Sequence, residues 1–368
     1  MGQDVDSNPR VNSSSEENPT PGKNLRVGTS GWSYEDWVGS FYPKSLPKEL
    51  YLLFYAQVFS TVEIDSSFYH IPAEASARKW ARETPADFTF TAKVPKVITH
   101  EAMLDPTLIR APLETFLHNM RPLEEVNKMD GYLLQLPPKF NKMEHWTNLE
   151  TFLKNWNPAR KLAVEFRHLS WLLPPDVVAT INARAAEPPN KLRVDWNLNK
   201  NSNNKNTRGI PIANLLQEPE IQDWRDPMKI IAGITARETF SLLRDHQTIY
   251  TTVIEPLLPP VIQVTDPRAV YIRFHGFGRH PWFNYDFQLG EIQDWAKKIA
   301  AILPQVKQVN TYWNNHFSGY AVKNGLELLK YLNLSPKTAP QEVNLFRIRQ
   351  SKGFIPKGQR SIDGFLKK

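Results

Sequence analysis

The amino-acid sequence predicts an α/β fold, a (β/α)8 TIM-type barrel. Eight short runs rich in β-branched and aromatic residues alternate with longer amphipathic stretches, and this alternation indicates βαβ units around a parallel sheet. The chain of 368 residues accommodates such a barrel, which usually needs about 250 residues, together with an insertion and two tails.

The predicted strands share β-forming residues and are bounded by turn residues. They are Leu25–Thr29, Thr61–Asp65, Phe88–Lys93, Gly131–Leu136, Lys161–Glu165, Ile249–Ile254, Ala269–Phe274 and Lys307–Trp313. Helical periodicity occupies most of the intervals between them. The predicted helices are Pro47–Phe59, Ala73–Glu83, Pro106–Lys128, Trp146–Trp156, Pro174–Ala183, Arg237–His246, Leu289–Leu303 and Ala321–Leu332.

One stretch interrupts the alternation. Residues 184–235 fit no simple crossover, and residues 197–208 within them form a polar, Asn-rich segment of low complexity. We interpret the stretch as a solvated insertion, with a loop that contacts nucleic acid as the alternative. Lys191–Asp195 is a second candidate for the sixth strand.

The charge of the chain is unevenly distributed. Residues 1–24 carry −2 and are rich in Ser, Asn, Pro and Glu, which is typical of a disordered leader. Residues 336–368 carry +6 and are predicted to form a basic, flexible tail. The formal charge of +7 therefore leaves only +3 for the predicted barrel, residues 25–335. A nearly neutral body attracts phosphate weakly, so the overall basicity alone does not indicate nucleic-acid binding.

Several classes of protein are excluded by composition. The chain has no cysteine, which excludes disulfide frameworks, cysteine-ligated metals and thiol nucleophiles. No apolar run approaches the roughly 20 residues that cross a bilayer, and the polar N-terminus lacks a signal-peptide core. We expect a cytoplasmic protein, associated with the nucleoid if it binds the DNA clamp discussed below.

Polar side chains follow seven of the eight predicted strands. Because the carboxyl ends of parallel barrel strands share one face, we expect these side chains to meet in one mouth. The candidate catalytic residues are Glu63, Lys93, His100, Glu165, His168 and His275. The candidate substrate-binding residues are Trp32, Gln135, Arg167, Arg273, Trp313, Asn314 and Asn315. Such a mixture can bind an anionic or polyhydroxylated ligand and transfer protons.

Simpler structural roles remain open for the same residues. Glu165 and Arg167 can form a buried ion pair that fixes the rim of the barrel. His168 and His275 can be structural hydrogen-bonding groups, and tryptophans more often pack than stack on a ligand.

Six motifs in order make the chain similar to a known family. They are Val27-Gly-Thr-Ser-Gly-Trp-Ser-Tyr34, Val62-Glu-Ile-Asp-Ser-Ser-Phe-Tyr69, Phe90-Thr-Ala-Lys93 with Thr99-His100, Leu134-Gln-Leu-Pro-Pro138, Ala163-Val-Glu-Phe-Arg-His168 with Trp171, and Tyr271-Ile-Arg-Phe-His-Gly276. From about residue 25 to 335 the chain resembles the YecE-like family, domain of unknown function 72 (DUF72). The resemblance implies a TIM-type barrel and no established activity. Asp65 stands where the family pattern leads us to expect Asn, and the insertion and both tails also depart from that pattern.

The C-terminal residues suggest a partner. Gln359, Ile362, Phe365 and Leu366 have the spacing of a PIP box, the peptide by which proteins dock on the sliding clamp PCNA. In a short helical turn the three apolar side chains would form one plug for a groove, with Gln359 beside it. A C-terminal segment that folds back on the barrel is the alternative.

Three functions are compatible with these features. The first is a clamp-associated DNA-processing or DNA-repair protein whose barrel mouth binds a phosphate-containing substrate and cleaves a phosphodiester or glycosidic bond; endonuclease IV is a precedent at the level of the fold alone. A metal site could be formed by Glu63, His100, Glu165, His168 and His275. However, Lys93, Arg167 and Arg273 would repel a divalent ion, so metal-free chemistry is slightly favoured. The sequence does not identify a cofactor. The alternatives are a metabolic hydrolase, lyase or isomerase of a small phosphorylated or sugar-like ligand, and a DNA-binding module without enzymatic activity.

Overall fold

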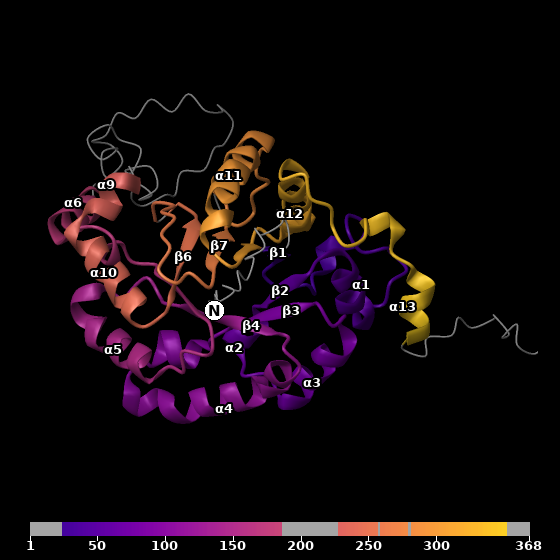
Figure 1. Cartoon of the computed structure of the whole chain (residues 1–368), viewed down its shortest axis with the longest axis horizontal. Coiled ribbons are helices and arrows are strands. Elements are labelled where there is room, and N and C mark those ends of the chain that lie inside the picture. The colour runs from indigo at the N-terminus through magenta and orange to yellow at the C-terminus, as the bar shows by residue number, and fades with distance from the viewer. Residues whose placement is uncertain (1–23, 186–226, 257, 279–280, 352–368) are drawn as a thin grey trace, which may run out of the picture.

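The computed structural model describes residues 24–185, 227–256, 258–278 and 281–351. Eight parallel strands surround a central axis in the order β1-β8-β7-β6-β5-β4-β3-β2 (Figure 1). A single parallel bridge between Ser30 and Glu63 joins the two ends of this sheet, and the Gly31 amide donates to the Glu63 carbonyl at 2.8 Å. The predicted (β/α)8 TIM-type fold is therefore confirmed.

The strands lie within two residues of their predicted bounds. They are β1 (Leu25–Thr29), β2 (Thr61–Ile64), β3 (Thr89–Lys93), β4 (Met129–Gln135), β5 (Leu162–Glu165), β6 (Ile249–Ile254), β7 (Val270–Phe274) and β8 (Val309–Trp313). Because β6 pairs with both β5 and β7, Ile249–Ile254 is the sixth strand of the barrel. The other candidate, Lys191–Asp195, lies outside the described residues.

Helices cover the outside of the barrel (Figure 1). Those in the described part of the chain are α1 (Tyr51–Val58), α2 (Ser66–Tyr69), α3 (Glu74–Glu83), α4 (Pro106–Glu125), α5 (Lys142–Asn155), α6 (Pro175–Ala185), α9 (Pro227–Ala232), α10 (Ile234–Asp245), α11 (Leu289–Ile302), α12 (Tyr320–Tyr331) and α13 (Leu345–Ser351). Helix α5 begins four residues before its predicted start because Asn141 caps it, accepting a hydrogen bond from the Glu144 amide at 2.9 Å. None of the described helices has the length and apolar character that crossing a membrane requires.

The ordered chain continues beyond the predicted start of the flexible tail at residue 336. The Lys337 amide donates to the Val58 carbonyl at 3.0 Å, and Val343 and the α13 residue Ile348 are buried. Helix α13 lies beside α1 (Figure 1). The net charge of +6 favoured a flexible tail, and the short apolar run Val343, Leu345, Phe346 and Ile348 was not recognised as a packing segment. The leader, most of the insertion and the last 17 residues, including the PIP-box-like residues Gln359, Ile362, Phe365 and Leu366, lie outside the described residues.

Side chains alternate between the inside and the outside of the barrel. A small apolar cluster fills the interior and includes Leu133, Ala163, Ile249, Tyr271 and Tyr312. Their neighbours in sequence, such as Leu134, Val164, Ile272 and Trp313, belong to the larger core between sheet and helices. This period of two follows from the geometry of a strand, and it also decides which residues at the strand ends reach the mouth.

Gly28 of β1 allows β1 and β2 to approach closely. A Cβ atom at this position would overlap the Thr61 carbonyl oxygen. We therefore expect Gly28→Ala to lower the free energy of unfolding by about 1–3 kcal/mol, the usual cost of overpacking, in urea unfolding followed by circular dichroism. Gly290→Ala in α11 is the control, because nothing lies within 4 Å of its added Cβ. Equal effects of the two substitutions would contradict this account of Gly28.

Candidate active site at the barrel mouth

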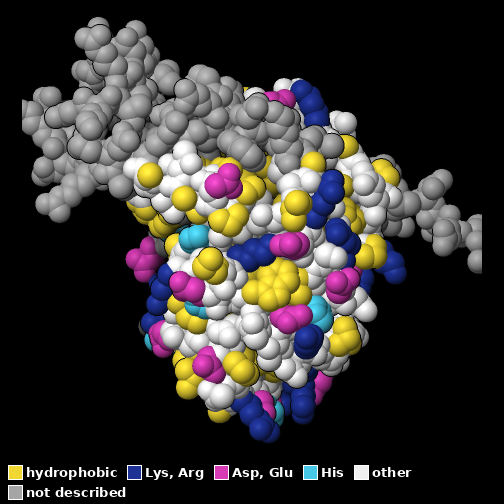
Figure 2. Space-filling view, turned by 90° about the vertical axis from the view of Figure 1, so that its left-hand side faces the viewer, with side chains coloured by type: hydrophobic (Ala, Val, Ile, Leu, Met, Phe, Trp, Pro, Cys, Tyr) yellow, Lys and Arg dark blue, Asp and Glu magenta, His cyan; other side chains and the backbone are white. Residues whose placement is uncertain are grey.

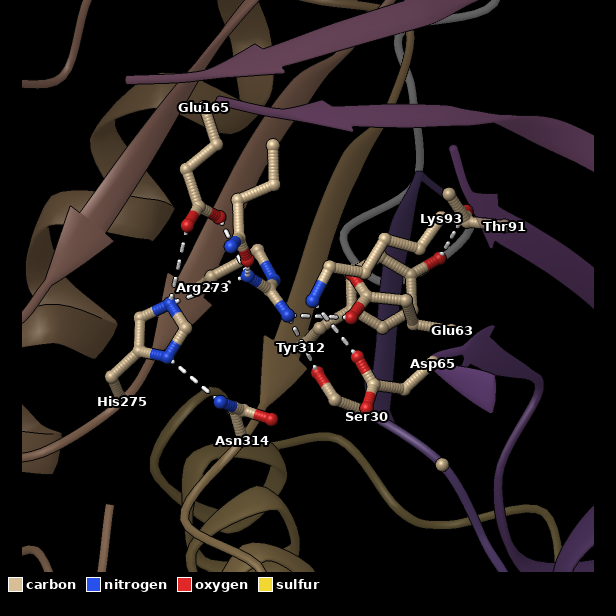
Figure 3. Close-up of polar contacts among 12 residues, drawn as sticks. Ser30, Glu63, Asp65, Thr91, Lys93, Glu165, Arg273, His275, Tyr312 and Asn314 are labelled. Carbon is tan, nitrogen blue, oxygen red and sulfur yellow. Dashed lines mark hydrogen bonds and ion pairs between the residues drawn. The ribbon is translucent and has the colours of Figure 1, made fainter. Parts of the chain in front are cut away.

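The carboxyl ends of the strands bring most of the predicted site residues together. Figure 3 shows Glu63, Lys93, Glu165, Arg273, His275 and Asn314 converging from β2, β3, β5, β7 and β8. Glu63, Lys93, Glu165, Arg273 and His275 are all buried. Period-two alternation explains their convergence, since each follows an inward-facing residue by two or four positions.

Arg273 is the centre of the network. Its guanidinium donates to Glu63 Oε1 at 2.6 Å and to Glu165 Oε2 at 2.6 Å (Figure 3). It also lies 3.2 Å from the Gln135 side-chain oxygen and 3.3 Å from the Ser30 hydroxyl. Arg273 is fully buried, and the two carboxylates raise its pKa even though burial itself lowers it. This side chain therefore carries a permanent charge, and both of its terminal nitrogens have partners, whereas Nε has none among the described residues.

A second arginine extends the network towards β6. Arg167 donates from Nε to Glu165 Oε1 at 2.5 Å and from Nη1 to Glu255 Oε2. Its Nη2 lies 3.0 Å from His275 Nε2, and because a guanidinium only donates, this imidazole nitrogen accepts. The Asn314 side-chain amide lies 2.8 Å from Nδ1 of the same ring. The alternative role of Glu165 and Arg167 as a buried ion pair is thus part of the structure.

The buried groups differ in their protonation. Burial alone would raise the pKa of Glu165, but Arg167 and Arg273 outweigh it and hold that pKa well below its usual range. Burial and the same two guanidinium groups lower the pKa of His275 to about 3, so its imidazole is neutral. Burial raises the pKa of Glu255 to about 7, with Arg167 opposing the shift and Glu165 adding to it. Glu255 therefore exchanges its proton near neutral pH.

Glu255 is the functional candidate that the sequence analysis missed. It follows Ile254 directly at the end of β6, and its side chain is fully buried. Among the described residues its Oε1 atom has no hydrogen-bond partner. The rule that identified the other strand ends would also have identified Glu255, because it is an acidic residue at the carboxyl end of the sixth predicted strand.

A more exposed ion pair lies beside this network. Lys93 Nζ is 3.1 Å from Asp65 Oδ1 and 4.2 Å from the centre of the Phe68 ring. Burial would raise the pKa of Asp65, but Lys93 and Arg273 lower it, so the carboxylate is ionised. Its side chain is 23% exposed, the largest exposed fraction among the four carboxylates of the mouth.

Aromatic side chains surround the mouth on two sides. Tyr34 and His316 stack with ring centres 4.4 Å apart, and Phe283 and Phe317 pack on His316. On the other side, His100 meets the Phe68 ring edge-on at 4.8 Å. Burial and then Lys93 lower the pKa of His100 to about 4, so it too is neutral. Trp32 is half-buried and contacts Trp80 of α3 with ring centres 5.8 Å apart.

Three predicted residues face away from the mouth, and these predictions are corrected. Trp313 is fully buried and stacks on Phe274 at 3.9 Å, in the layer between the sheet and the helices. Asn315 is fully buried and donates to the Tyr285 carbonyl and to Asn324. His168 lies within 2.8 Å of the Ser170 hydroxyl and lines a groove on the outer wall. Each stands at an outward position, one residue after an inward one.

The proposed metal cluster is not formed. Within the described ranges no group of three or more His, Asp or Glu side chains is placed to hold a metal ion. Arg273 already donates hydrogen bonds to oxygens of Glu63 and Glu165, and His168 lies outside the barrel. These residues therefore do not fit a bound divalent cation.

The chain is similar in sequence to one protein family over most of its length. The family model described as "Protein of unknown function DUF72" matches residues 26–190 and 231–345. UPF0759 protein YunF of Bacillus subtilis is 25% identical over 338 residues, which cover 88% of this chain and 100% of YunF. UPF0759 protein YecE of Escherichia coli is 29% identical over 43% of this chain and 54% of YecE.

Two crystal structures share the fold. A DUF72 family protein of Thermotoga maritima (TM1631) has a TM-score of 0.61 and 25% identity, covering 84% of this chain and 99% of its own. One from Enterococcus faecalis (EF0366) has a TM-score of 0.56 and 20% identity, covering 85% of this chain and 98% of its own. The gap in the family match, between residues 190 and 231, falls within the predicted insertion.

Proposed function

The chain belongs to the DUF72 family, whose description records no activity, and from the geometry of its barrel mouth we propose that it is an acid–base enzyme. Its reaction is hydrolysis, elimination or isomerisation of a small polyhydroxylated, sugar-like ligand. The observation that carries the proposal is Glu255, a buried carboxyl group at the carboxyl end of a barrel strand, one of whose oxygens has no hydrogen-bond partner in the described part of the chain.

Glu255 has the properties of a proton donor. A carboxyl group that is protonated for part of the time near pH 7 can give a proton to a leaving oxygen or exchange one with a substrate carbon. Arg167 fixes the Oε2 side of the group, which leaves Oε1 as the atom that donates. Asp65, which is ionised and partly exposed, supplies the complementary base or the group that orients a substrate hydroxyl.

The charges of the mouth favour a neutral ligand over a phosphate. Three carboxylates, Glu63, Asp65 and Glu165, already balance the three cations, Lys93, Arg167 and Arg273, and Glu255 adds a further negative charge whenever it is ionised. Both guanidinium groups already donate to carboxylates, so neither offers the open bidentate edge that phosphate recognition uses. Hydroxyl groups can instead bind the amides of Gln135 and Asn314 and the carboxylate of Asp65, beside aromatic faces.

The test combines binding and turnover by full-length protein. Saturation-transfer NMR with a panel of monosaccharides, disaccharides and the matching sugar phosphates is expected to show binding of neutral sugars, with no gain from phosphate. Asp65→Asn should weaken that binding, whereas Glu238→Gln, an exposed outer-wall substitution, should not. Glu255→Gln should keep binding and lose turnover. Binding of sugar phosphates or oligonucleotides without binding of neutral sugars would refute the proposal.

A second proposal concerns a partner. We propose that the PIP-box-like residues at the end of the chain dock on the sliding clamp PCNA and bring the barrel to DNA, where it would act in DNA processing or repair. Support comes from the spacing of Gln359, Ile362, Phe365 and Leu366 and from their distance along the chain from Ser351, where the described residues end. A clamp peptide needs such separation from its folded domain.

We expect full-length protein to bind immobilised PCNA, and Phe365→Ala with Leu366→Ala to lower that affinity at least about tenfold, as the loss of two anchor side chains does. Lys367→Ala is the matched control, because it removes a tail side chain outside the apolar plug. Equal binding by all three proteins, or binding by none, would contradict clamp docking.

A further inference from the structure

The polar groups of the mouth differ in their surroundings from those of the outer wall. Figure 2 shows Lys, Arg, Asp and Glu side chains standing among hydrophobic ones on one outer face of the molecule, where water can hydrogen-bond to them. In the mouth, Arg273 and His275 are buried, so a donor that faces another donor there is costly. The positions of the protons in the mouth can therefore be deduced from the contacts of its nitrogen atoms.

Two guanidinium groups determine which nitrogen of His275 carries the proton. The Nε2 atom lies 3.0 Å from Arg167 Nη2 and 3.4 Å from Arg273 Nη1. A guanidinium has no acceptor, so a hydrogen on Nε2 would point at other N–H groups. Glu165 Oε1 lies 3.8 Å from Nε2, which is too far for a hydrogen bond. Nε2 therefore carries a lone pair, and the single proton of the neutral ring is on Nδ1.

The proton on Nδ1 decides how the Asn314 amide lies. No other described side chain is at hydrogen-bond distance of Nδ1, and the amide Nδ2 atom is 2.8 Å from it (Figure 3). Two N–H groups cannot bond to each other, whereas the amide oxygen can accept from Nδ1–H. A half-turn of the amide exchanges its oxygen and nitrogen without changing its shape, so the hydrogen-bond network selects the orientation. We infer that Asn314 Oδ1 accepts from His275 Nδ1–H and that the Asn314 NH2 group is a hydrogen-bond donor to the ligand of the mouth.

Gln135 is held in the same way. Its Oε1 atom accepts from Arg273 Nη1 at 3.2 Å, and its NH2 group has no hydrogen-bond partner among the described residues. Both amides are half-buried, and in Figure 3 the end of Asn314 that points away from His275 lies on the side of Ser30 and Asp65. The mouth thus presents two NH2 donors beside the Asp65 carboxylate, each fixed through its oxygen by a buried N–H group.

These groups select a ligand by its acceptor atoms, a step that rests on the proposed function. An amide NH2 group bonds only to an acceptor, and the ionised Asp65 carboxylate bonds only to a donor. A hydroxyl group is both, so a polyol can satisfy all three groups, whereas an ammonium group cannot accept from either amide. Asn314 is therefore a specificity-determining residue for a neutral, sugar-like ligand.

The position of the proton can be measured on the unaltered chain. Long-range proton–nitrogen correlation NMR of full-length protein, labelled at the histidine nitrogens, distinguishes a proton on Nδ1 from one on Nε2. Loss of signals in His275→Gln identifies those of His275. We expect the Nδ1–H form at neutral pH. The Nε2–H form would overturn the inference, because Nδ1 would then accept from the Asn314 NH2 group.

Asn314→Asp tests the donor. A carboxylate oxygen also accepts from Nδ1–H, so the Nδ1–H signal should remain, but the variant lacks the NH2 group that faces the ligand. The probes are D-glucose, D-galactose and D-mannose. For those that the original protein binds, we expect the affinity to fall about three- to tenfold, as the loss of one hydrogen bond implies.

Asn344→Asp is the matched control. This exposed side chain lies directly before α13 and accepts from the Arg347 amide through its oxygen at 3.0 Å, which an aspartate also does, so sugar binding should not change. Unchanged affinity of Asn314→Asp would overturn the inference, because it would show that an oxygen of residue 314 faces the ligand. If no sugar binds to the original protein, the proposed function fails, and the NMR spectra still decide the orientation of Asn314.

Discussion

Replacement of Arg273 by methionine is expected to lower the free energy of unfolding by about 3–5 kcal/mol, the largest effect of a single substitution in the mouth. Arg273 pairs with both Glu63 and Glu165 at 2.6 Å, and all three side chains are fully buried. Methionine fills a similar volume but leaves two buried carboxylates without this partner. The cost is that of uncompensated charge rather than of a cavity, and urea unfolding at pH 7 measures it.

The electrostatic explanation can be separated from loss of packing. The triple variant Glu63→Gln, Arg273→Met, Glu165→Gln removes the cation and both anions together, so we expect it to recover most of the lost stability. Arg273→Lys keeps the charge but cannot bridge two carboxylates, and its loss should be intermediate. A triple variant no more stable than Arg273→Met would show that packing of the guanidinium matters more than its charge.

The fold was predictable because its strands carry strong local signals. The run Ile249–Ile254 was predicted with the bounds that β6 has, since six β-forming residues stand between polar turn residues. Helix α13 was not predicted, because the apolar run Val343, Leu345, Phe346 and Ile348 is short and lies in a basic segment, and packing against α1 is what orders it. Whether such a short helix forms depends on its tertiary contacts, and these cannot be recognised from sequence periodicity.

The site was predictable only in part. The position of polar residues at strand ends correctly placed Glu63, Lys93, Glu165 and Arg273 in one mouth. The alternation of side chains within each strand would have removed Trp313 and His168 as candidates, since each stands next to an inward residue. The ion pairs among these residues could not be predicted. Nothing in the sequence indicates that Arg273 bridges Glu63 and Glu165, because each is more than 100 positions away from it in the chain.

Glu255→Gln is expected to change how stability depends on pH. The pKa of Glu255 is about 7 in the folded protein, against the ordinary value of 4.5. The folded state therefore holds this proton more tightly than the unfolded chain does. The contribution of the group is fully present below about pH 4.5 and is lost as pH rises towards 7, by about 3 kcal/mol in total.

An amide cannot ionise, so Glu255→Gln removes this loss. We expect the variant to exceed the original protein in free energy of unfolding by about 3 kcal/mol at pH 8 and to differ little from it at pH 5. Urea titrations from pH 5 to 8 measure the difference, and Glu125→Gln at the end of α4 is the control, since a substitution at this exposed position should change neither value. Equal slopes for Glu255→Gln and the original protein would mean that Arg167 keeps Glu255 ionised throughout this range. The carboxyl group would then have no proton to donate at neutral pH, and the acid–base function would have to be assigned to another residue. A stabilised Glu255→Gln variant that has lost turnover would instead show that the protein maintains a destabilising buried acid for its chemistry.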